Sequence, residues 1–195
     1  MVAQEVLDSL LRLLGREQVS TVEEELEFYS GDALTPLRAF RAAPVLSRRA
    51  DVVVRPQSQE QVVELVRLAA QHRVPMVPYG GGTGVMGAVV PVKGGIVFDL
   101  KGMNRIVDIS EEDRIAVVEA GVVLRDLEEA LNRRGLMLGH DPWSLPIATV
   151  GGAIATNGVG YRASLYGSMG EQVLGLEVAL PNGRVLRTRA LPLYS

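Results

Sequence analysis

A glycine-rich stretch directly after an apolar run constrains the fold of this chain more than any other feature. Val74 to Val77 reads as a buried strand, and the sequence PYGGGTGVMGAVVP follows it at residues 78–91. Gly82, Gly84 and Gly87 within this stretch spell G-x-G-x-x-G. The segment therefore predicts a strand that runs into a loop whose backbone is open to close approach by a ligand.

The residues before this loop predict a strand, a helix and a second strand. Asp51 to Val54 reads as a strand, and Ser58 with Gln61 forms a capping box for the helix that follows. Short turns between these elements require a right-handed crossover with parallel strands. The apolar residues assigned to the core face of the helix are Val62, Val63, Leu65, Val66, Ala69 and Ala70.

The N-terminal part predicts helices and an irregular linker. Apolar residues at helical spacing over residues 2–14 stop at Gly15, which can take a left-handed conformation. A T-x-x-E capping box that starts at Thr21 predicts a second helix. The sequence from Tyr29 to Arg49 has no regular apolar pattern and contains prolines at positions 36 and 44. We therefore expect residues 1–44 to precede the main domain as a helical segment and linker.

The main domain, residues 45–195, is predicted to hold two α/β lobes, at about 45–107 and 108–195. In the second lobe, Ile115 to Glu119 reads as a strand, Leu124 to Arg134 as a helix, and Leu136 to Leu138 as a short strand. Further on, Val173 to Thr188 predicts a β-hairpin, because its Asn-Gly turn supplies positive φ angles at residues 182 and 183.

A nicotinamide dinucleotide site does not fit the glycine loop. Such a site needs a long helix directly after the glycines, because the pyrophosphate rests on the N-terminus of that helix. Here AVVPVKGG, residues 88–95, leaves no room for a helix before the buried strand Ile96 to Asp99. Asp99 therefore matches a ribose-binding carboxylate by position only. The Walker phosphate loop is also excluded, since the chain has no Gly-Lys-Ser or Gly-Lys-Thr.

Composition excludes several other classes of protein. The chain has 195 residues, is 47% hydrophobic and carries a net charge of −3 with acids and bases interspersed, which argues against nucleic-acid binding. Its apolar runs are interrupted before roughly 18 residues, so no transmembrane span is expected. The first residues include Glu5 and Asp8 and lack a basic region, unlike a signal peptide. There is no Cys, no His cluster for a metal is visible, and a cytoplasmic location is expected.

The glycine loop itself fits an anion nest. Gly80, Gly81, Gly82 and Gly84 permit positive φ and close approach of a phosphate, and Thr83 adds a hydroxyl donor. A diphosphate is the expected ligand. The alternative is that the glycines form a tight turn and nothing more.

A second segment favours the ligand-binding interpretation of the glycine loop over the tight turn. HDPWSLPIATVGGAIATNGVG, residues 140–160, combines a proline-bound loop with Thr149, Gly151 and Gly152 and a short helix that ends at Asn157-Gly158. Two loops of small residues, one in each lobe, are what a long dinucleotide between the lobes would need.

Five blocks in order now carry a family resemblance. They are DVVVRPQSQEQVVELVRLAAQHRVPMVPYGGGTG, GGIVFDLKGMNRI, VVEAGVVLRDLEEAL, TVGGAIATNGVG and YGSMGEQVLGLEVALPNGRVL. Over about residues 45–189 the chain resembles the PCMH-type FAD-binding domain of the vanillyl-alcohol oxidase superfamily. Within that superfamily it is similar to FAD-linked glycolate oxidases and D-lactate dehydrogenases, and to alkyl-dihydroxyacetonephosphate synthase through GHDPWSLPIATVGG. The resemblance implies an α/β (α+β) fold in which two subdomains clasp an extended FAD.

The resemblance also implies which residues contact FAD. The first loop would hold the pyrophosphate, the second would run beside the isoalloxazine, and the residues after it would continue the flavin and ribityl contacts. Members that bind flavin covalently usually have a His in the first loop, so FAD is expected to bind non-covalently here. The residues expected to contact FAD are Pro78, Tyr79, Gly80, Gly81, Gly82, Thr83, Gly84, Pro142, Trp143, Ser144, Leu145, Ala148, Thr149, Gly151, Gly152, Ala155, Thr156 and Asn157.

The sequence departs from the family after this point. A further block with Gly-Ser-Glu-Gly-Thr and a cap domain are expected from the resemblance, and neither occurs in the 195 residues. The FAD-binding domain is therefore expected to be incomplete at its C-terminus, with catalytic residues that cannot be assigned. The implied activity is oxidation of a small-molecule 2-hydroxy acid such as glycolate or D-lactate, completed by the cap or a second subunit. The alternatives are a non-catalytic or subunit-type FAD-binding module, or an alkyl-dihydroxyacetonephosphate synthase-like flavoenzyme. The assembly is left open between a homo-oligomer and a subunit complex.

A few single residues stay open. His140 beside Asp141 either titrates near the flavin or is a structural loop residue. Trp143 either flanks the isoalloxazine or covers its own loop. Arg162 and Tyr166 either reach substrate or flavin, or face solvent.

Overall fold

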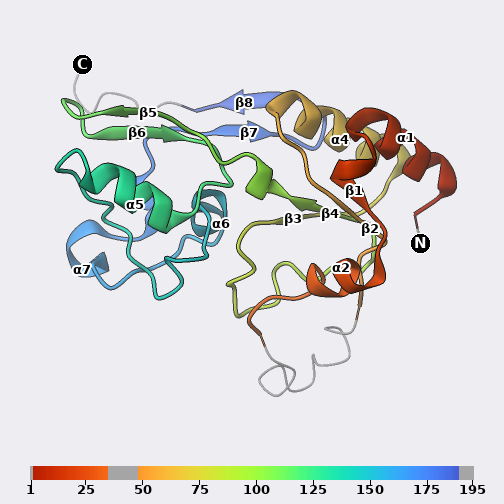
Figure 1. The fold of residues 1–195 in the computed structure, drawn as a ribbon, viewed down its shortest axis with the longest axis horizontal. Coiled ribbons are helices and arrows are strands. Elements are labelled where there is room, and N and C mark those ends of the chain that lie inside the picture. Colours follow the sequence, from red (N-terminus) through yellow and green to blue (C-terminus); the bar gives the residue numbers. More distant parts are fainter. Residues whose placement is uncertain (1, 35–47, 189–195) are drawn as a thin grey trace.

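The computed structural model describes residues 2–34 and 48–188, and its elements form two groups that lie side by side (Figure 1). Each group has its own hydrophobic core. The central part of the predicted linker, with Pro36 and Pro44, lies outside the described residues. Within the described ranges, no helix has the length and apolar character needed to span a membrane.

The first group is built on a four-stranded sheet in the order β1-β2-β4-β3. Its strands are β1 (Val19–Ser20), β2 (Val52–Val54), β3 (Met76–Tyr79) and β4 (Ile96–Asp99). Strands β2 and β3 both pair in parallel with β4, which lies between them, and β1 pairs antiparallel with β2. The predicted parallel strand–helix–strand unit is therefore confirmed. All four residues of β4 are buried, as its apolar sequence indicates.

Helices cover both faces of this sheet. Helices α1 (Gln4–Leu14) and α4 (Gln59–His72) pack on one face, and α2 (Glu23–Phe28) lies on the other (Figure 1). Because alternate residues of a strand point to opposite faces, β2 and β4 serve both cores. Val52, Val54, Ile96 and Phe98 face α1 and α4, and Val53 and Val97 pack with Tyr29, Ala50 and Tyr79.

The helix starts agree with the sequence in part. Ser58 Oγ accepts a hydrogen bond from Gln61 N at 3.3 Å and so caps α4, but the Gln61 side chain bonds Gln57 N at 2.7 Å, not Ser58. Only half of that capping box forms. The T-x-x-E box was wrong, because α2 begins after Val22 with no side-chain cap. In α4, Ala70 is exposed and does not belong to the core face as predicted.

The second group contains an antiparallel hairpin and three helices, of which the first two along the chain pack with the hairpin around one core. The hairpin is β5 (Ile106–Ser110) with β6 (Ile115–Val118), and the helices are α5 (Leu124–Asn132), α6 (Val150–Ala155) and α7 (Ala163–Tyr166). The strand at β6 and the helix at α5 were predicted, whereas β5 was not. The strand predicted at residues 136–138 was wrong, because this segment has no pairing partner and its leucines pack against the core instead.

A last hairpin joins β7 (Glu177–Ala179) to β8 (Val185–Arg187) and lies along α4 of the first group (Figure 1). The predicted hairpin is confirmed, although it begins at Glu177 and not at residue 173. At its turn only Gly183 has a positive φ, of 74°, so the Asn-Gly pair does not supply two positive φ angles as expected. Short 3-10 helices complete the chain at η1 (Arg16–Gln18), η4 (Leu100–Gly102) and η5 (Met169–Gln172).

Candidate cofactor site

The two predicted loops touch each other. The first loop, residues 80–95, connects β3 to β4, and the second loop, residues 139–149, leads into α6. A Cβ atom on Gly80 would overlap Thr149 Oγ1, and one on Gly81 would overlap the carbonyl oxygen of Ile147. The two groups of elements therefore meet backbone against backbone, and only glycine permits this approach at residues 80 and 81.

The next residues of the first loop have unused backbone donors. Among the described residues, no acceptor lies within hydrogen-bond range of the backbone N–H groups of residues 81–85. Gly82 has a φ of +64°, and the Thr83 side chain makes no hydrogen bond in the described part of the chain. Since buried or half-buried amides in proteins nearly always have a partner, a run of free N–H groups in a glycine turn has the character of an anion nest. These residues fit the diphosphate of a dinucleotide.

The glycines after the second loop are used differently. Gly151 N donates to Ala120 O at 2.8 Å, and Gly152 N donates to Thr149 Oγ1 at 3.3 Å. Thr149 is 1% exposed and caps α6 with its hydroxyl. The amides that the sequence suggested as flavin donors at 151 and 152 are therefore engaged within the chain. Exposed surface follows only at Ala155, Thr156 and Asn157.

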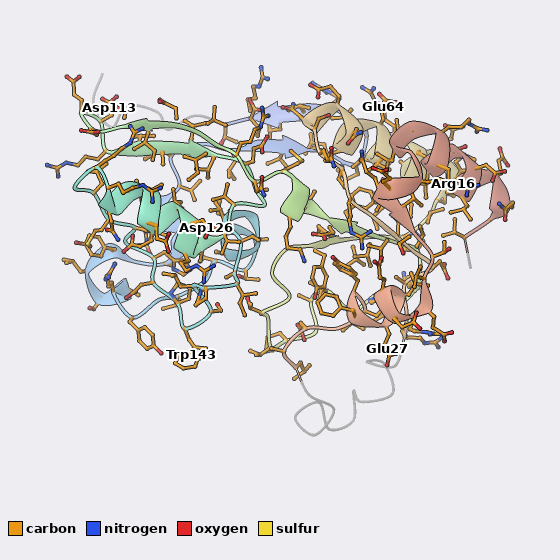
Figure 2. The ribbon with its side chains drawn as sticks, viewed as in Figure 1. Arg16, Glu27, Glu64, Asp113, Asp126 and Trp143 are labelled. Atoms are coloured by element: carbon orange, nitrogen blue, oxygen red, sulfur yellow. The ribbon has the colours of Figure 1, made fainter. Side chains whose placement is uncertain are left out.

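The remaining predicted residues are spread between buried and exposed positions. Pro78 is exposed at the end of β3, and Ala148 is buried with its carbonyl bonded to Leu124 N at 2.9 Å. Trp143 is 87% exposed at the edge of the molecule, so it does not cover its own loop (Figure 2). The other second-loop residues, Pro142, Ser144 and Leu145, are half-buried.

His140 is buried at the start of the second loop. It is 1% exposed, and its Nδ1 atom has no partner in the described part of the chain. Burial lowers the pKa of His140, and the charge of Asp141 opposes that shift only in part. The Asp141 carboxylate bonds Arg162 instead, through the backbone N at 2.7 Å and Nε at 3.3 Å. The same Arg162 donates to Leu138 O at 2.9 Å, so it braces the second loop.

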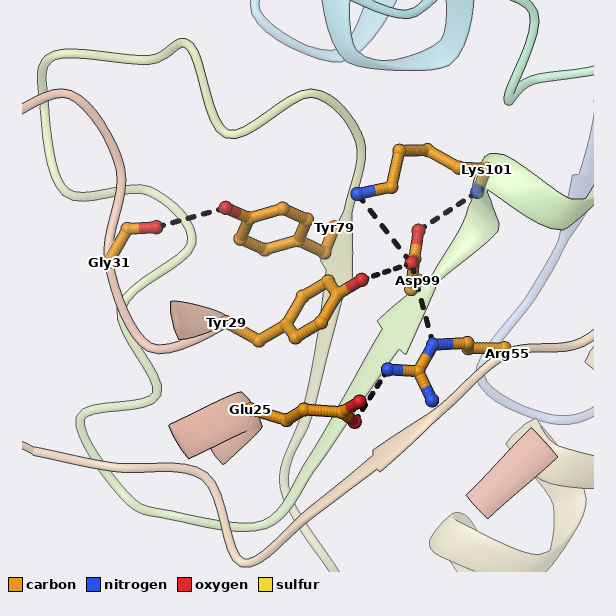
Figure 3. Close-up of polar contacts among 7 residues, drawn as sticks. All are labelled: Glu25, Tyr29, Gly31, Arg55, Tyr79, Asp99 and Lys101. Atoms are coloured by element: carbon orange, nitrogen blue, oxygen red, sulfur yellow. Dashed lines mark hydrogen bonds and ion pairs between the residues drawn. The ribbon is translucent and has the colours of Figure 1, made fainter. Parts of the chain in front are cut away.

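A polar cluster lies behind the first loop (Figure 3). Tyr29 donates to Asp99 Oδ2 at 2.6 Å, Lys101 N donates to Asp99 Oδ1 at 3.0 Å, and Arg55 donates to Glu25 at 2.6 Å. Burial, followed by the hydrogen bond to Asp99, raises the pKa of Tyr29 to about 12. Asp99 is 4% exposed and engaged in this cluster, which agrees with the conclusion that it is not a ribose ligand.

Tyr79 fixes the start of the first loop from within this cluster. Its ring packs edge to face on Tyr29 with centroids 4.9 Å apart, and Lys101 Nζ lies 5.4 Å from the Tyr79 ring centroid. Its hydroxyl donates to Gly31 O at 3.3 Å. Burial raises the pKa of Tyr79, helped by the charges of Asp99 and Asp32. The Tyr79 side chain thus supports the loop from behind and is 4% exposed.

An open surface pocket of about 370 Å³ beside α6 was not predicted. Its size lies within the range of pockets that bind small molecules. One sequence feature marks it: Gly175 lies inside an apolar run where a strand was expected, and a glycine leaves that position without a side chain. The lining residues are Ile154, Gly170, Val173, Leu174, Gly175, Leu176 and Thr188. No group of three or more His, Cys, Asp or Glu side chains suited to a metal occurs in the described ranges.

Residues 50–189 match the FAD binding domain family, and the fold is that of the vanillyl-alcohol oxidase type. The chain belongs to that family, and its cofactor is FAD. The predicted family, fold class and cofactor are confirmed.

Relatives of known sequence and solved structures agree with this family assignment. The chain is 36% identical over 188 residues to the glycolate oxidase subunit GlcD of Bacillus subtilis (strain 168), covering 96% of this chain and 38% of that protein. It is 35% identical over 187 residues to the mitochondrial D-lactate dehydrogenase [cytochrome] of Arabidopsis thaliana, covering 96% of this chain and 31% of that protein. The chain thus spans about a third of the length of these relatives.

Two solved structures share the fold. One is an alkyldihydroxyacetonephosphate synthase, with a TM-score of 0.87 and 26% identity, covering 100% of this chain and 40% of that chain. The other is p-cresol methylhydroxylase with substrate bound, with a TM-score of 0.78 and 27% identity, covering 96% of this chain and 36% of that chain.

Proposed function

We propose that this chain is the FAD-binding part of a flavin-dependent oxidoreductase that oxidises a 2-hydroxy acid such as glycolate or D-lactate. The observation that carries the proposal is the 35 to 36% identity, over 96% of the chain, to a glycolate oxidase subunit and a D-lactate dehydrogenase. Because the chain spans 38% and 31% of those proteins, we assign the substrate pocket to a part outside these residues, either a cap domain or a second subunit.

The free amides of residues 81–85 and the Thr83 hydroxyl would hold the diphosphate of FAD. Tyr79 and the contact with the second loop hold the start of this segment in place before a ligand arrives. Charge-assisted hydrogen bonds from preorganised amides are stronger than neutral ones. The first loop contains no His, so we propose that FAD is held without a covalent bond.

The second loop and the exposed end of α6 would lie along the flavin. In this region Trp143, Ala155, Thr156 and Asn157 are the exposed members of the predicted set. Bound FAD supplies the two-electron oxidation of the hydroxyl-bearing carbon. The chain's own residues would bind and orient the cofactor.

A second function is favoured by one observation. The solved alkyldihydroxyacetonephosphate synthase matches this chain with a TM-score of 0.87 over its full length. In that alternative the bound flavin would serve a reaction without net oxidation. A FAD-binding module that has no turnover of its own is the remaining alternative.

Flavin spectroscopy separates these functions. This chain, joined to the cap domain or second subunit that carries the substrate pocket, is titrated with FAD, and D-lactate or glycolate is then added without oxygen. We expect FAD to bind and one of the 2-hydroxy acids to bleach its absorption. Binding without bleaching, together with formation of alkyl-dihydroxyacetone phosphate, would instead support the synthase. A protein that binds no FAD contradicts the whole assignment.

A further inference from the structure

A short N-terminal segment holds the first loop in place. This segment, residues 29–34, is here called the strap. Ala33 N donates to Gly84 O at 2.8 Å, and Gly87 N donates to Asp32 Oδ2 at 2.9 Å. With the Tyr79 bond to Gly31, the strap contacts the loop before, within and after the residues whose amides are free. The strap lies outside residues 50–189, which match the FAD-binding family.

The Asp32 side chain is aimed at the loop by its own backbone. Its Oδ1 atom accepts a hydrogen bond from Leu34 N at 2.9 Å, an Asx turn that fixes the carboxylate. Its Oδ2 atom is thereby turned towards Gly87 N, and it lies 3.2 Å from where a Cβ atom on Gly84 would be. Both oxygens are engaged, and each receives a backbone N–H.

The strap is itself anchored in the core. The Tyr29 hydroxyl bonds the buried Asp99 of β4, and Ser30 Oγ accepts a hydrogen bond from Ala50 N at 2.9 Å. The Ser30 hydroxyl also donates to Leu26 O in α2. Asp32 therefore extends from a fixed point of the sheet, which lets it fix the loop in turn.

Electrostatics would argue against a carboxylate at this place. An acidic side chain close to a diphosphate repels it, and such repulsion weakens binding. A carboxylate at this position is explained if its role is to hold backbone N–H groups. A charged acceptor makes a stronger hydrogen bond to an N–H group than a neutral acceptor does. The bonds to Leu34 and Gly87 fit that explanation.

We propose that Asp32 is a positioning residue for FAD. By holding Gly87 and packing against Gly84, it keeps the amides of residues 81–85 turned away from the chain's own acceptors and available to the diphosphate. The inference rests on the proposed assignment of the diphosphate to this loop. Asp32 itself does not touch the cofactor.

The test compares the two ends of the same loop. Asp32→Ala removes both acceptors, and Asp32→Asn leaves one acceptor oxygen for two donors. Asp51→Ala is the matched control, because Asp51 Oδ2 accepts a hydrogen bond from Gly95 N at 3.0 Å at the far end of the loop. Each variant is measured by FAD titration, by thermal unfolding without FAD, and by hydrogen exchange of the Gly87 amide without FAD.

For Asp32→Ala we expect the Kd for FAD to rise about 10- to 100-fold, as loss of a charged hydrogen bond predicts. Asp32→Asn should fall between Asp32→Ala and the unchanged protein. Asp51→Ala should leave the Kd within about twofold while lowering the unfolding temperature. The Gly87 amide should exchange faster in Asp32→Ala than in Asp51→Ala.

The outcomes distinguish failure of the proposed function from failure of the positioning role of Asp32. If the unchanged protein does not bind FAD, the proposed function fails. If it binds FAD and Asp32→Ala binds equally well, the positioning role is overturned. Tighter binding by Asp32→Asn than by the unchanged protein would also overturn it, because charge repulsion would then dominate. Should Asp32→Ala not fold, Asp32→Asn and its Gly87 exchange rate decide the question.

Discussion

The two glycine segments look alike in sequence but do different work in the structure. In the first loop, the N–H groups of residues 81–85 have no acceptor among the described residues. After the second loop, Gly151 and Gly152 both donate within the chain, and Gly151 packs against Ala120. The first segment is open to a ligand, and the second closes a packing contact.

The difference shows that glycine in such a motif has three separate uses. Gly80 and Gly81 allow two loops to touch, Gly82 allows a positive φ, and Gly151 allows a helix to approach a turn. Only the second use produces a ligand site directly. Substitutions of glycine by alanine, which add one methyl group, can separate these three uses of glycine.

The largest effect is expected for Gly81→Ala. The added Cβ would overlap Ile147 O and lie 3.0 Å from Ala148 Cα, and that backbone is held by the bond from Leu124 N to Ala148 O. We expect the free energy of unfolding to fall by about 3 kcal/mol, as for overpacking of a rigid contact. Urea unfolding measures it. The control is Gly84→Ala, whose Cβ meets only Asp32 Oδ2 at 3.2 Å, and equal losses in both would show that the loops do not meet as described.

Gly82→Ala tests the ligand-facing part of the first loop. Its φ of +64° is unfavourable for Ala, and the new Cβ would overlap the Tyr79 hydroxyl. The left-handed conformation costs Ala about 1 to 2 kcal/mol. We expect the loop to shift and the Kd for FAD to rise about 10-fold or more, measured by flavin fluorescence. Unchanged affinity would show that the diphosphate does not bind at this loop.

Gly151→Ala tests the packing role of the second segment. Its Cβ would lie 2.8 Å from Ala120 Cβ and 3.0 Å from Ala120 O. The free energy of unfolding should fall by about 1 to 2 kcal/mol, while the Kd for FAD stays within about threefold. Thermal unfolding and FAD titration on one sample give both quantities. A large loss of affinity with full stability would reverse the comparison between the two segments.

The smallest effect concerns pH and His140, which is buried at the start of the second loop. Its pKa in the folded state is lower than the ordinary value of 6.5, because burial disfavours the charged form. As the pH falls through this range, the unfolded chain takes up the proton first, so stability is full above about pH 6.5 and decreases below it. His140→Gln should flatten this dependence. Urea unfolding at several pH values is the measurement, and an unchanged slope would exclude His140 as its source.

The first group was predictable because its signals are local. The apolar run at Ile96 to Asp99 can only be a buried strand, and Ser58 marks the start of α4 by a side chain that reaches three residues ahead. Residues 88–95, with Pro91, Gly94 and Gly95, excluded a helix after the glycine loop. Family resemblance added FAD, which no residue pattern in the chain specifies by itself.

The second group was less predictable because its elements depend on partners. Strand β5 has two exposed residues among five and lacks an apolar run, so only its pairing with β6 defines it. Leu136 and Leu138 alternate like a strand, yet they pack on the core beside α5. Of the candidate site, the sequence indicated both loops. It did not indicate that they touch, or that Asp32 holds one of them, because these contacts join residues 55 or more positions apart.

The contact between Arg67 of α4 and the β7–β8 hairpin bears on how the chain is made. Arg67 Nη2 donates to Gly183 O at 3.2 Å, across 116 residues of sequence. At translation rates of about 5 to 20 residues per second, α4 leaves the ribosome on the order of 6 to 23 s before this partner. The first group thus emerges with one face of α4 uncovered. Contacts so distant in sequence also slow folding, so a nascent chain holds its sheet, its glycine loop and its strap before the hairpin closes over the helix.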